Sequence, residues 1–395
     1  MRSLMRKTTK VVAAISSVTA GLAVATTVAT AAPVRAAQPA LRYTVTRILS
    51  GLALRHSYTA AGSAASKSGT LTQPDDISVL GRDLFVAFQN GVGPQGQASA
   101  DGNRASTIVE MTLRGVPLRQ WDVAGKSDGL TADPASHTLI ATVNEDAHSS
   151  VYVIDPRAPR GVQVQHYRYS KPLPHNGGTD AISIYHGLVL ISASAPGTTG
   201  PAAPQPAYPA VYRVTFDRAS HIAAVRPLFF DEATATVANL GGHARGDRVR
   251  LALTDPDSNE IVPLSARRFR GDLTVTSQGD KEQIFVRRAG RPGQRLFVLT
   301  LSNSVDDTAW VTSPFGRLFA TDHDGDAVDV VTGRFHPGAV LAAVTPCDAN
   351  GSPATCPAPG FPPNYLGVLN PWTGQLSRLP LRGASLQPQG MAFVG

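Results

Sequence analysis

One short sequence pattern recurs along this chain and limits the folds that it can adopt. Each copy starts with a polar residue, continues with a small or polar one, and then alternates apolar positions with others. The copies span residues 75–79, 128–132, 180–184, 307–311 and 389–393, with a degenerate copy at 235–239. Four of the five clear copies begin with Asp. A repeat at a regular spacing predicts similar structural units in a row or a ring.

The spacing of the copies sets the size of one unit. The starts at residues 75, 128 and 180 lie 53 and 52 residues apart, and the degenerate copy adds an interval of 55. The last two intervals are longer, 72 and 82 residues, and contain an Arg/Gly/Pro stretch at 287–294 and a Cys-bounded, Pro-rich stretch at 345–364. The whole span corresponds to about six units, each long enough for a four-stranded propeller blade.

Apolar runs that follow most copies predict the secondary structure. Such runs span residues 84–88, 138–143, 187–192 and 317–321 and are bounded by turn-forming residues. After residue 36 the sequence shows no sustained helical periodicity. The chain is therefore predicted to be all-β and built of short strands.

The two ends of the chain carry related phrases, QPDDISV from residue 73 and QPQGMAF from residue 387. A propeller closes when one blade takes strands from both ends, which also hides exposed strand edges. We expect Gln389–Val394 to be the innermost strand of a blade whose outer strands come from Leu41–Leu71. The predicted fold is a β-propeller of six blades, with seven left open because the 82-residue interval has room for another.

The first 36 residues have the composition of a secretory signal. They contain five basic residues and no acidic one, a long run of small and apolar residues, and possible cleavage sites after Ala31 and Ala36. An uncleaved membrane anchor is the alternative, since the uncharged run is long enough to span a bilayer. We expect cleavage, a single propeller domain over 37–395 without a membrane span, and a secreted monomer.

Cleavage after Ala36 also changes the net charge. The full chain carries 36 Lys and Arg against 29 Asp and Glu, a net charge of +7, and loss of the five basic residues leaves +2. This small charge argues against nucleic acid as a partner. A small molecule or a protein is the expected partner.

The chain has two cysteines, Cys347 and Cys356, separated by the polar turn sequence DANGSPAT. In an exported protein this arrangement predicts one short disulfide loop. The spacing matches no zinc-binding pattern.

The inner-strand phrases D-G-L at Asp128 and Q-G-M at Gln389, together with the turn dipeptides at 133–134, 155–156, 255–256 and 370–371, resemble those of the NHL and SMP-30/gluconolactonase-like propellers. The chain is most similar to exported bacterial propellers without an assigned activity. In gluconolactonase-like enzymes a divalent cation lies in the central channel, held by Glu, Asn and Asp. The resemblance implies metal ligands at Asp75, Asp76, Asp128, Asp180, Asn239 and Asp307, although the Glu that begins the family's pattern has no match here.

Acidic loops are expected around one mouth of the predicted channel. They contain Asn144, Glu145 and Asp146, then Asp255–Glu260, then Asp322 and Asp324. Clustered carboxylates repel one another unless a cation lies among them, so a bound Ca²⁺ is a physical expectation. The alternative is that these Asp and Asn residues only form turns, in which their side chains bond their own backbone.

Two functions from different classes fit these features. The first is a non-enzymatic propeller that binds a ligand or a protein through its acidic face. The second is a Ca²⁺-dependent hydrolase of the lactonase or esterase kind, with His175 or His243 as general base. The common serine-hydrolase and zinc-peptidase motifs do not occur in the sequence. Each of these histidines could equally be a solvated loop residue.

Overall fold

The computed structural model describes residues 43–174, 177–194, 207–239, 243–348 and 363–395. The chain divides into a unit Met1–Ala40 and a unit Leu41–Gly395, and every described residue belongs to the second. The predicted signal sequence therefore lies outside the described residues. Within them, no helix is long and apolar enough to cross a membrane.

The described residues form mainly antiparallel sheets, in which three pairs of outer strands are parallel, and one 3₁₀ turn, η1 (Gly51–Ala53). Two sheets of four strands are β4 (Pro74–Leu80), β5 (Asp83–Phe88), β6 (Ala105–Thr112), β7 (Pro117–Ala124), and β22 (Val305–Trp310), β25 (Val340–Val344), β26 (Tyr365–Leu369), β27 (Leu376–Arg378). A larger sheet joins two groups of four through a parallel pair of outer strands: β8 (Ser127–Asp133), β9 (Thr138–Val143), β10 (Ser150–Ile154), β11 (Val164–Tyr169), and β12 (Ile182–Tyr185), β13 (Leu188–Ser192), β14 (Pro209–Asp217), β15 (Ile222–Phe230).

The remaining sheets have added outer strands. One contains β18 (Pro256–Ile261), β19 (Leu273–Ser277), β20 (Glu282–Arg287), β21 (Arg295–Thr300), β16 (Thr234–Val237) and β17 (Arg248–Arg250). Another contains β29 (Pro388–Val394), β23 (Arg317–Asp322), β24 (Ala327–Thr332), β1 (Tyr43–Ser50) and β28 (Leu381–Gly383). A separate hairpin consists of β2 (Arg55–Thr59) and β3 (Ser66–Thr70).

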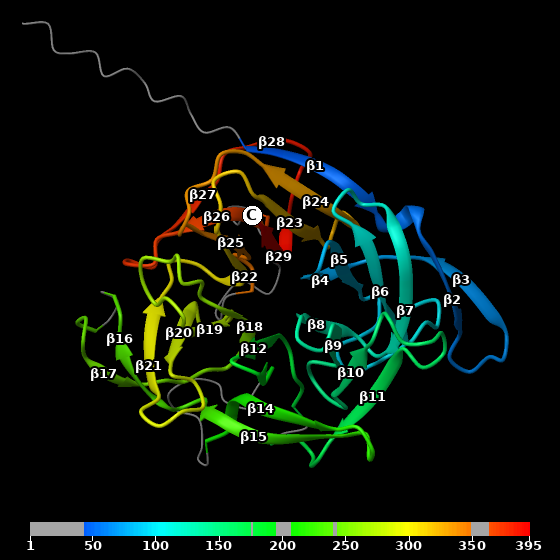
Figure 1. The fold of residues 1–395 in the computed structure, drawn as a ribbon, viewed down its shortest axis with the longest axis horizontal. Coiled ribbons are helices and arrows are strands. Elements are labelled where there is room, and N and C mark those ends of the chain that lie inside the picture. The colour runs from blue at the N-terminus through cyan, green and yellow to red at the C-terminus, as the bar shows by residue number, and fades with distance from the viewer. Residues whose placement is uncertain (1–42, 175–176, 195–206, 240–242, 349–362) are drawn as a thin grey trace, which may run out of the picture. The chain divides into compact units, whose positions relative to one another are not determined.

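The innermost strands lie side by side around a central channel (Figure 1). In order, β4 contacts β8, β8 contacts β12, β12 contacts β18, β18 contacts β22, β22 contacts β29, and β29 contacts β4. Apolar side chains fill the space between neighbouring sheets, as where Phe85 and Trp121 of one sheet pack against Leu139 and Tyr152 of the next. This arrangement confirms the predicted β-propeller.

The two ends of the described chain share one sheet, which confirms the predicted closure. β29 pairs with β23, β23 with β24, and β24 with β1, for example Phe319 with Ala392 and Val45 with Val331. Tyr43 and Met391 belong to the same apolar cluster. The hairpin β23–β24 lies between the terminal strands because the chain leaves β22, forms two strands of the next sheet, and then returns to β25.

Three details of the expected strand assignment are wrong. The segment Leu41–Leu71 supplies only β1 to the closing sheet, because β2 and β3 pair with each other. The run 317–321 does not pair with the copy at residue 307, because β23 pairs with β29 and β24. The degenerate copy at 235–239 is not an inner strand either; β16 lies at the outer side of its sheet, and the inner strand is β18, a segment expected to be a loop.

We predict that truncating a buried side chain in either terminal strand of the closing sheet lowers the stability of the whole propeller. Met391→Ala and Tyr43→Ala each remove a nearly fully buried side chain and should each lower the free energy of unfolding by about 2–5 kcal/mol. Thr44→Ala, at an exposed position of β1, should change it by less than about 0.5 kcal/mol. Urea unfolding measures all three, and a negligible effect of both buried changes would contradict the closure.

Candidate functional site

The innermost strands share one backbone irregularity at their start. In four of them the pairing register with the second strand shifts, between Pro74 and Ile77, Ser127 and Leu130, Pro256 and Asn259, and Val305 and Thr308. A fifth shift lies where Pro388 and Met391 of β29 pair with Asp322 and Ala320. Each is a β-bulge with an additional residue on the inner strand, a device that redirects side chains.

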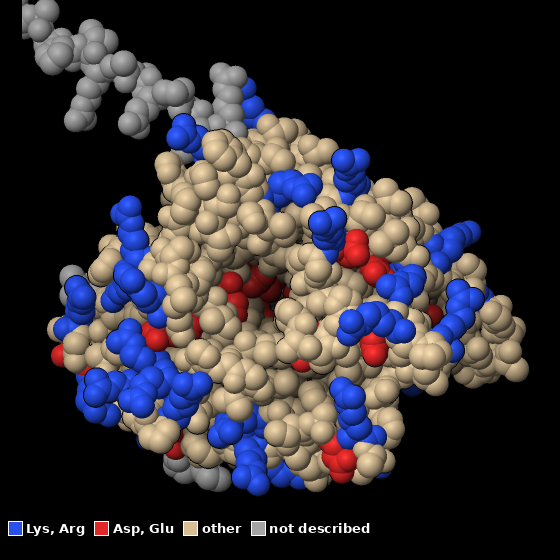
Figure 2. Space-filling model, viewed as in Figure 1, with Lys and Arg blue, Asp and Glu red and all other residues tan. Residues whose placement is uncertain are grey.

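The first bulge residue of each strand lines the channel. These residues are Asp75, Asp128, Asp257, Asp306 and Gln389, and Asp180 occupies the corresponding place two residues before β12. They surround one cavity of about 470 Å³. We call the five aspartates and Gln389 the carboxylate ring. Figure 2 shows acidic side chains inside the central hollow and basic ones on the surrounding face.

The second bulge residue holds neighbouring inner strands together. Asp76 accepts hydrogen bonds from the backbone N–H of Ile77 and of Leu130 on the next strand, both 2.6 Å. Asp307 does the same for Thr308 and Met391, both 2.7 Å. These two carboxylates are structural bridges between strands.

In the D-G-L and Q-G-M phrases the second bulge residue is glycine, for a steric reason. A Cβ on Gly129 would lie 2.4 Å from the carbonyl oxygen of Asp180, and a Cβ on Gly390 would lie 2.4 Å from that of Asp75. The neighbouring strand approaches too closely for any side chain at these two positions. The glycine in these two copies of the phrase is therefore required by the close packing of inner strands.

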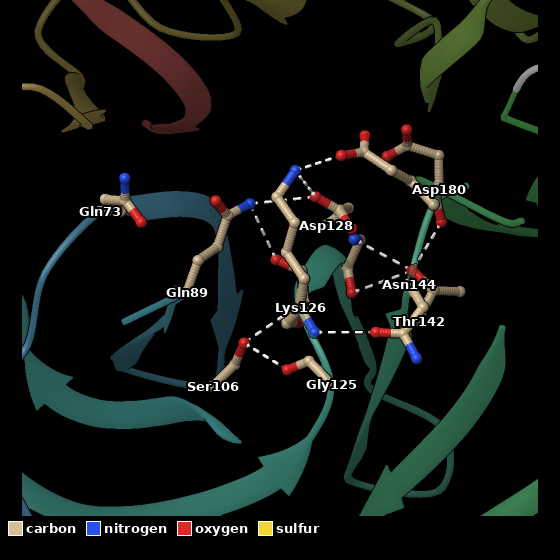
Figure 3. A network of polar contacts seen from close by, with 12 residues as sticks. Gln73, Gln89, Ser106, Gly125, Lys126, Asp128, Thr142, Asn144 and Asp180 are labelled. Carbon is tan, nitrogen blue, oxygen red and sulfur yellow. Dashed lines mark hydrogen bonds and ion pairs between the residues drawn. The ribbon is translucent and has the colours of Figure 1, made fainter. Parts of the chain in front are cut away.

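Lys126 is the one basic residue among the described residues that line the cavity, against ten acidic ones. Its ammonium group lies 2.8 Å from Asp128 Oδ1 and also contacts Glu145 Oε1 (Figure 3). Asn144 accepts a hydrogen bond from the Lys126 backbone N–H at 3.0 Å. Burial alone would lower the pKa of Lys126, but Asp128, Glu145 and Asp75 raise it, so the side chain stays charged.

Burial and mutual repulsion make the acidic residues of the cavity hard to ionise. Burial, followed by repulsion from other carboxylates, raises the pKa of Asp75, Asp180 and Asp257 well above the ordinary value. Burial raises the pKa of Asp76 to about 7 and that of Glu260 to about 8. The cavity therefore favours any positive charge, whether protons or a cationic ligand.

Several oxygen atoms around the cavity have no hydrogen-bond partner within the described part of the chain. They are Asp128 Oδ2, Asn259 Oδ1 and Gln389 Oε1. Asp128 and Asn259 are only 7% and 8% exposed. A buried acceptor without a donor is costly, so a ligand or water that donates hydrogen bonds to these atoms would stabilise the site.

Five of the six residues predicted as metal ligands line this cavity: Asp75, Asp76, Asp128, Asp180 and Asp307. The sixth, Asn239, does not, because it follows an outer strand rather than an inner one. Its side-chain amide donates to the carbonyl oxygens of Thr300 and Thr373, each at 2.8 Å, and accepts from the Thr300 N–H. Asn239 is a structural residue.

Of the residues predicted in acidic loops, Glu145 and the segment Asp257–Glu260 line the cavity. Asn144 supports Lys126, as described above, and Asp146 is not among the lining residues. Asp322 lies in the closing sheet, where it pairs with Arg47 at 2.8 Å and accepts from the Gly325 N–H. The expectation that Asp322 and Asp324 line the acidic channel is wrong. Asp322 is bonded within the closing sheet, and Asp324 is exposed in the turn between β23 and β24.

The candidate general bases receive no support from the described geometry. His243 is exposed and is not among the residues that line the cavity, and His175 lies outside the described residues. Cys356 also lies outside them, so the disulfide with Cys347 stays a prediction.

The sequence analysis missed three members of the site, Lys126, Asp306 and Gln389, and it placed Asp257 and Asn259 in a loop rather than on an inner strand. One signal was present: Pro256-Asp257 starts a strand as Pro74-Asp75 and Pro388-Gln389 do. In each case Pro begins the inner strand and the next residue belongs to the carboxylate ring.

The set of acceptor oxygens suits a cation that donates hydrogen bonds better than one metal ion. Among the described residues, no group of three or more His, Cys, Asp and Glu side chains converges as a metal site requires. Three carboxylates of the cavity, Asp76, Asp307 and Glu260, are already hydrogen-bonded to protein groups. The unpaired oxygens of Asp128 and Asn259 are nevertheless ligands of the type that Ca²⁺ binds.

The chain matches no protein-family model and no curated protein. Similar solved structures include a periplasmic gluconolactonase from Pseudomonas aeruginosa, 15% identical, with a TM-score of 0.40 and coverage of 86% of this chain and 94% of that one. The β-propeller domain of Cps50 (Swd1) from Myceliophteria thermophila is 13% identical, with a TM-score of 0.41 and coverage of 83% and 79%. A protein of unknown function from Bacteroides thetaiotaomicron is 8% identical, with a TM-score of 0.45 and coverage of 87% and 65%. These likenesses are too distant to assign a family or a function.

We predict that the protein loses stability as the pH rises from the acidic range to neutrality in the absence of a cationic ligand. Acids with a raised pKa keep their protons in the folded state at a pH where the unfolded chain has lost them. Since Asp76 shifts from 3.8 to about 7 and the ring aspartates shift upward as well, the unfolding free energy should fall between about pH 4 and pH 7.

Urea unfolding at low ionic strength over this pH range measures the effect. Asp306→Asn should make the decline shallower by up to about 1.4 kcal/mol per pH unit. Asp324→Asn, whose side chain is 69% exposed, should leave it unchanged. A wild-type unfolding free energy that increases over the same range would contradict the electrostatic description of the cavity.

Proposed function

We propose that this protein is an exported binding protein whose central channel holds a positively charged ligand. The observation that carries the proposal is the carboxylate ring, in which one bulge in successive inner strands directs acidic residues into a single cavity. Ten acidic residues and one lysine line that cavity, although the chain after residue 36 has a small positive net charge. A negative cavity in a basic surface concentrates cations by electrostatic attraction.

Export rests on the composition of the first 36 residues, and membership in the NHL and SMP-30/gluconolactonase-like group rests on the inner-strand phrases. Both are part of the proposal. The phrases support this membership because they lie on inner strands. There their glycines allow close contact with the next strand, and Asp76 accepts a hydrogen bond from it.

The proposal predicts that cations stabilise the protein by binding to its folded state. At low ionic strength and pH 8, 1,4-diaminobutane or calcium chloride should raise the melting temperature progressively with concentration, and sodium chloride of equal ionic strength should have much less effect. The double variant Asp257→Asn/Asp306→Asn should lose most of the cation-dependent increase. If no cation raises the melting temperature beyond the sodium chloride control, the proposed function is wrong.

A Ca²⁺-dependent lactonase or esterase is the second candidate, favoured by the unpaired oxygens of Asp128 and Asn259 in the channel. A bound Ca²⁺ would polarise a substrate carbonyl there.

Our proposal predicts no Ca²⁺-dependent hydrolysis of simple lactones and aryl esters. Assays with calcium chloride and with a chelator measure this. Saturable turnover that requires Ca²⁺ and disappears in Asp128→Asn, but not in Asp324→Asn, would replace the binding function with the hydrolase.

A further inference from the structure

The cavity already contains one ammonium group, and it belongs to the protein itself. Lys126 places its Nζ against the carboxylates of Asp128 and Glu145. In this part of the cavity, which we call the lysine half, the ammonium group offsets one of the two carboxylate charges. It also shows what chemical group the carboxylate ring can hold.

On the next strands, β12 and β18, a similar set of acceptors has no cation. Asp180 and Asp257 are ring members, and neither carboxylate contacts a basic side chain of the described residues. Asn259 lies between the two strands, where its Nδ2 donates to the Ala181 carbonyl oxygen at 2.6 Å. Its Oδ1 has no partner among those residues. We call Asp180, Asp257 and Asn259 the open half.

Contacts with the Ser192 hydroxyl help to hold Asp257 and Asn259 in position. Ser192 Oγ donates to the carbonyl oxygen of Asp257 at 2.6 Å, and Asn259 Nδ2 also lies 3.3 Å from Ser192 Oγ. Asn259 is nearly fully buried and lines the cavity, and a molecule in the cavity would supply the donor that its oxygen lacks. Two carboxylates and one amide oxygen match the three N–H donors of a primary ammonium group.

We infer that the open half is the binding site for a primary ammonium group of the ligand, and that Lys126 occupies the equivalent second site. This inference rests on the proposed function and narrows the ligand to a primary amine. It also makes Lys126 a determinant of specificity, because its side chain leaves room for one ligand ammonium rather than two.

Isothermal titration calorimetry with two probes of equal charge tests the donor requirement in the wild-type protein. Propylammonium offers three N–H donors and tetramethylammonium none. Charge-assisted hydrogen bonds should make propylammonium bind roughly tenfold or more tightly. Equal binding of both probes would overturn the ammonium site and leave general cation binding intact, whereas no binding of either probe or of Ca²⁺ would overturn the proposed function too.

Matched variants locate the site. Asp257→Asn should weaken propylammonium binding roughly tenfold, since it removes one charge-assisted acceptor. Asp128→Asn should weaken it by less than roughly threefold, because Lys126 already balances that charge. The reverse order of effects would contradict the assignment, and tight Ca²⁺ binding that excludes propylammonium would identify a metal site instead.

The role of Lys126 has its own readout. In the wild type, 1,4-diaminobutane and propylammonium should bind with similar affinity, because only one ammonium site is open. In Lys126→Met the second site is free, and the diamine should gain roughly tenfold over the monoamine. If the preference for the diamine does not change, Lys126 does not occupy a ligand site.

Discussion

The close contact between neighbouring inner strands is the constraint on which the rest of this structure depends. The strands approach until the carbonyl oxygens of Asp75 and Asp180 occupy the space of a Cβ on Gly390 and Gly129. Where the second bulge residue is acidic instead, Asp76 and Asp307 bridge to the backbone of the next strand. The same bulge directs the preceding residue into the channel, so that packing of the ring and formation of the acidic cavity have one structural cause.

The cavity concentrates negative charge at a cost in stability. Burial and repulsion raise the pKa of the ring aspartates, and only Lys126 among the described lining residues offsets them. A fold that served only stability would replace such residues with apolar ones, since buried charges without partners destabilise a protein. The distribution of charge is therefore best explained by a ligand that supplies the missing cation.

The sequence predicted the fold well because the repeated phrase encodes a local feature, the bulge and its glycine or acidic bridge. Closure was also predictable, since the phrase at residue 387 copies the one at residue 73. Asn239 was wrongly included because outer and inner strands share the same apolar alternation, and only contacts with the next strand distinguish them. Asp257 was placed in a loop because Ser258 and Asn259 interrupt the apolar pattern, and Lys126 was missed because it precedes its strand and belongs to no copy of the repeated phrase.

The most direct test of the central claim is crystallographic. Rubidium ions resemble ammonium in charge and are visible by anomalous scattering, so a crystal soaked in rubidium chloride shows where the cavity holds a cation. We predict an anomalous peak beside Asp180, Asp257 and Asn259, on the strands that follow the one next to the Lys126 ammonium group. Peaks confined to the outer surface, with none in the channel, would contradict it.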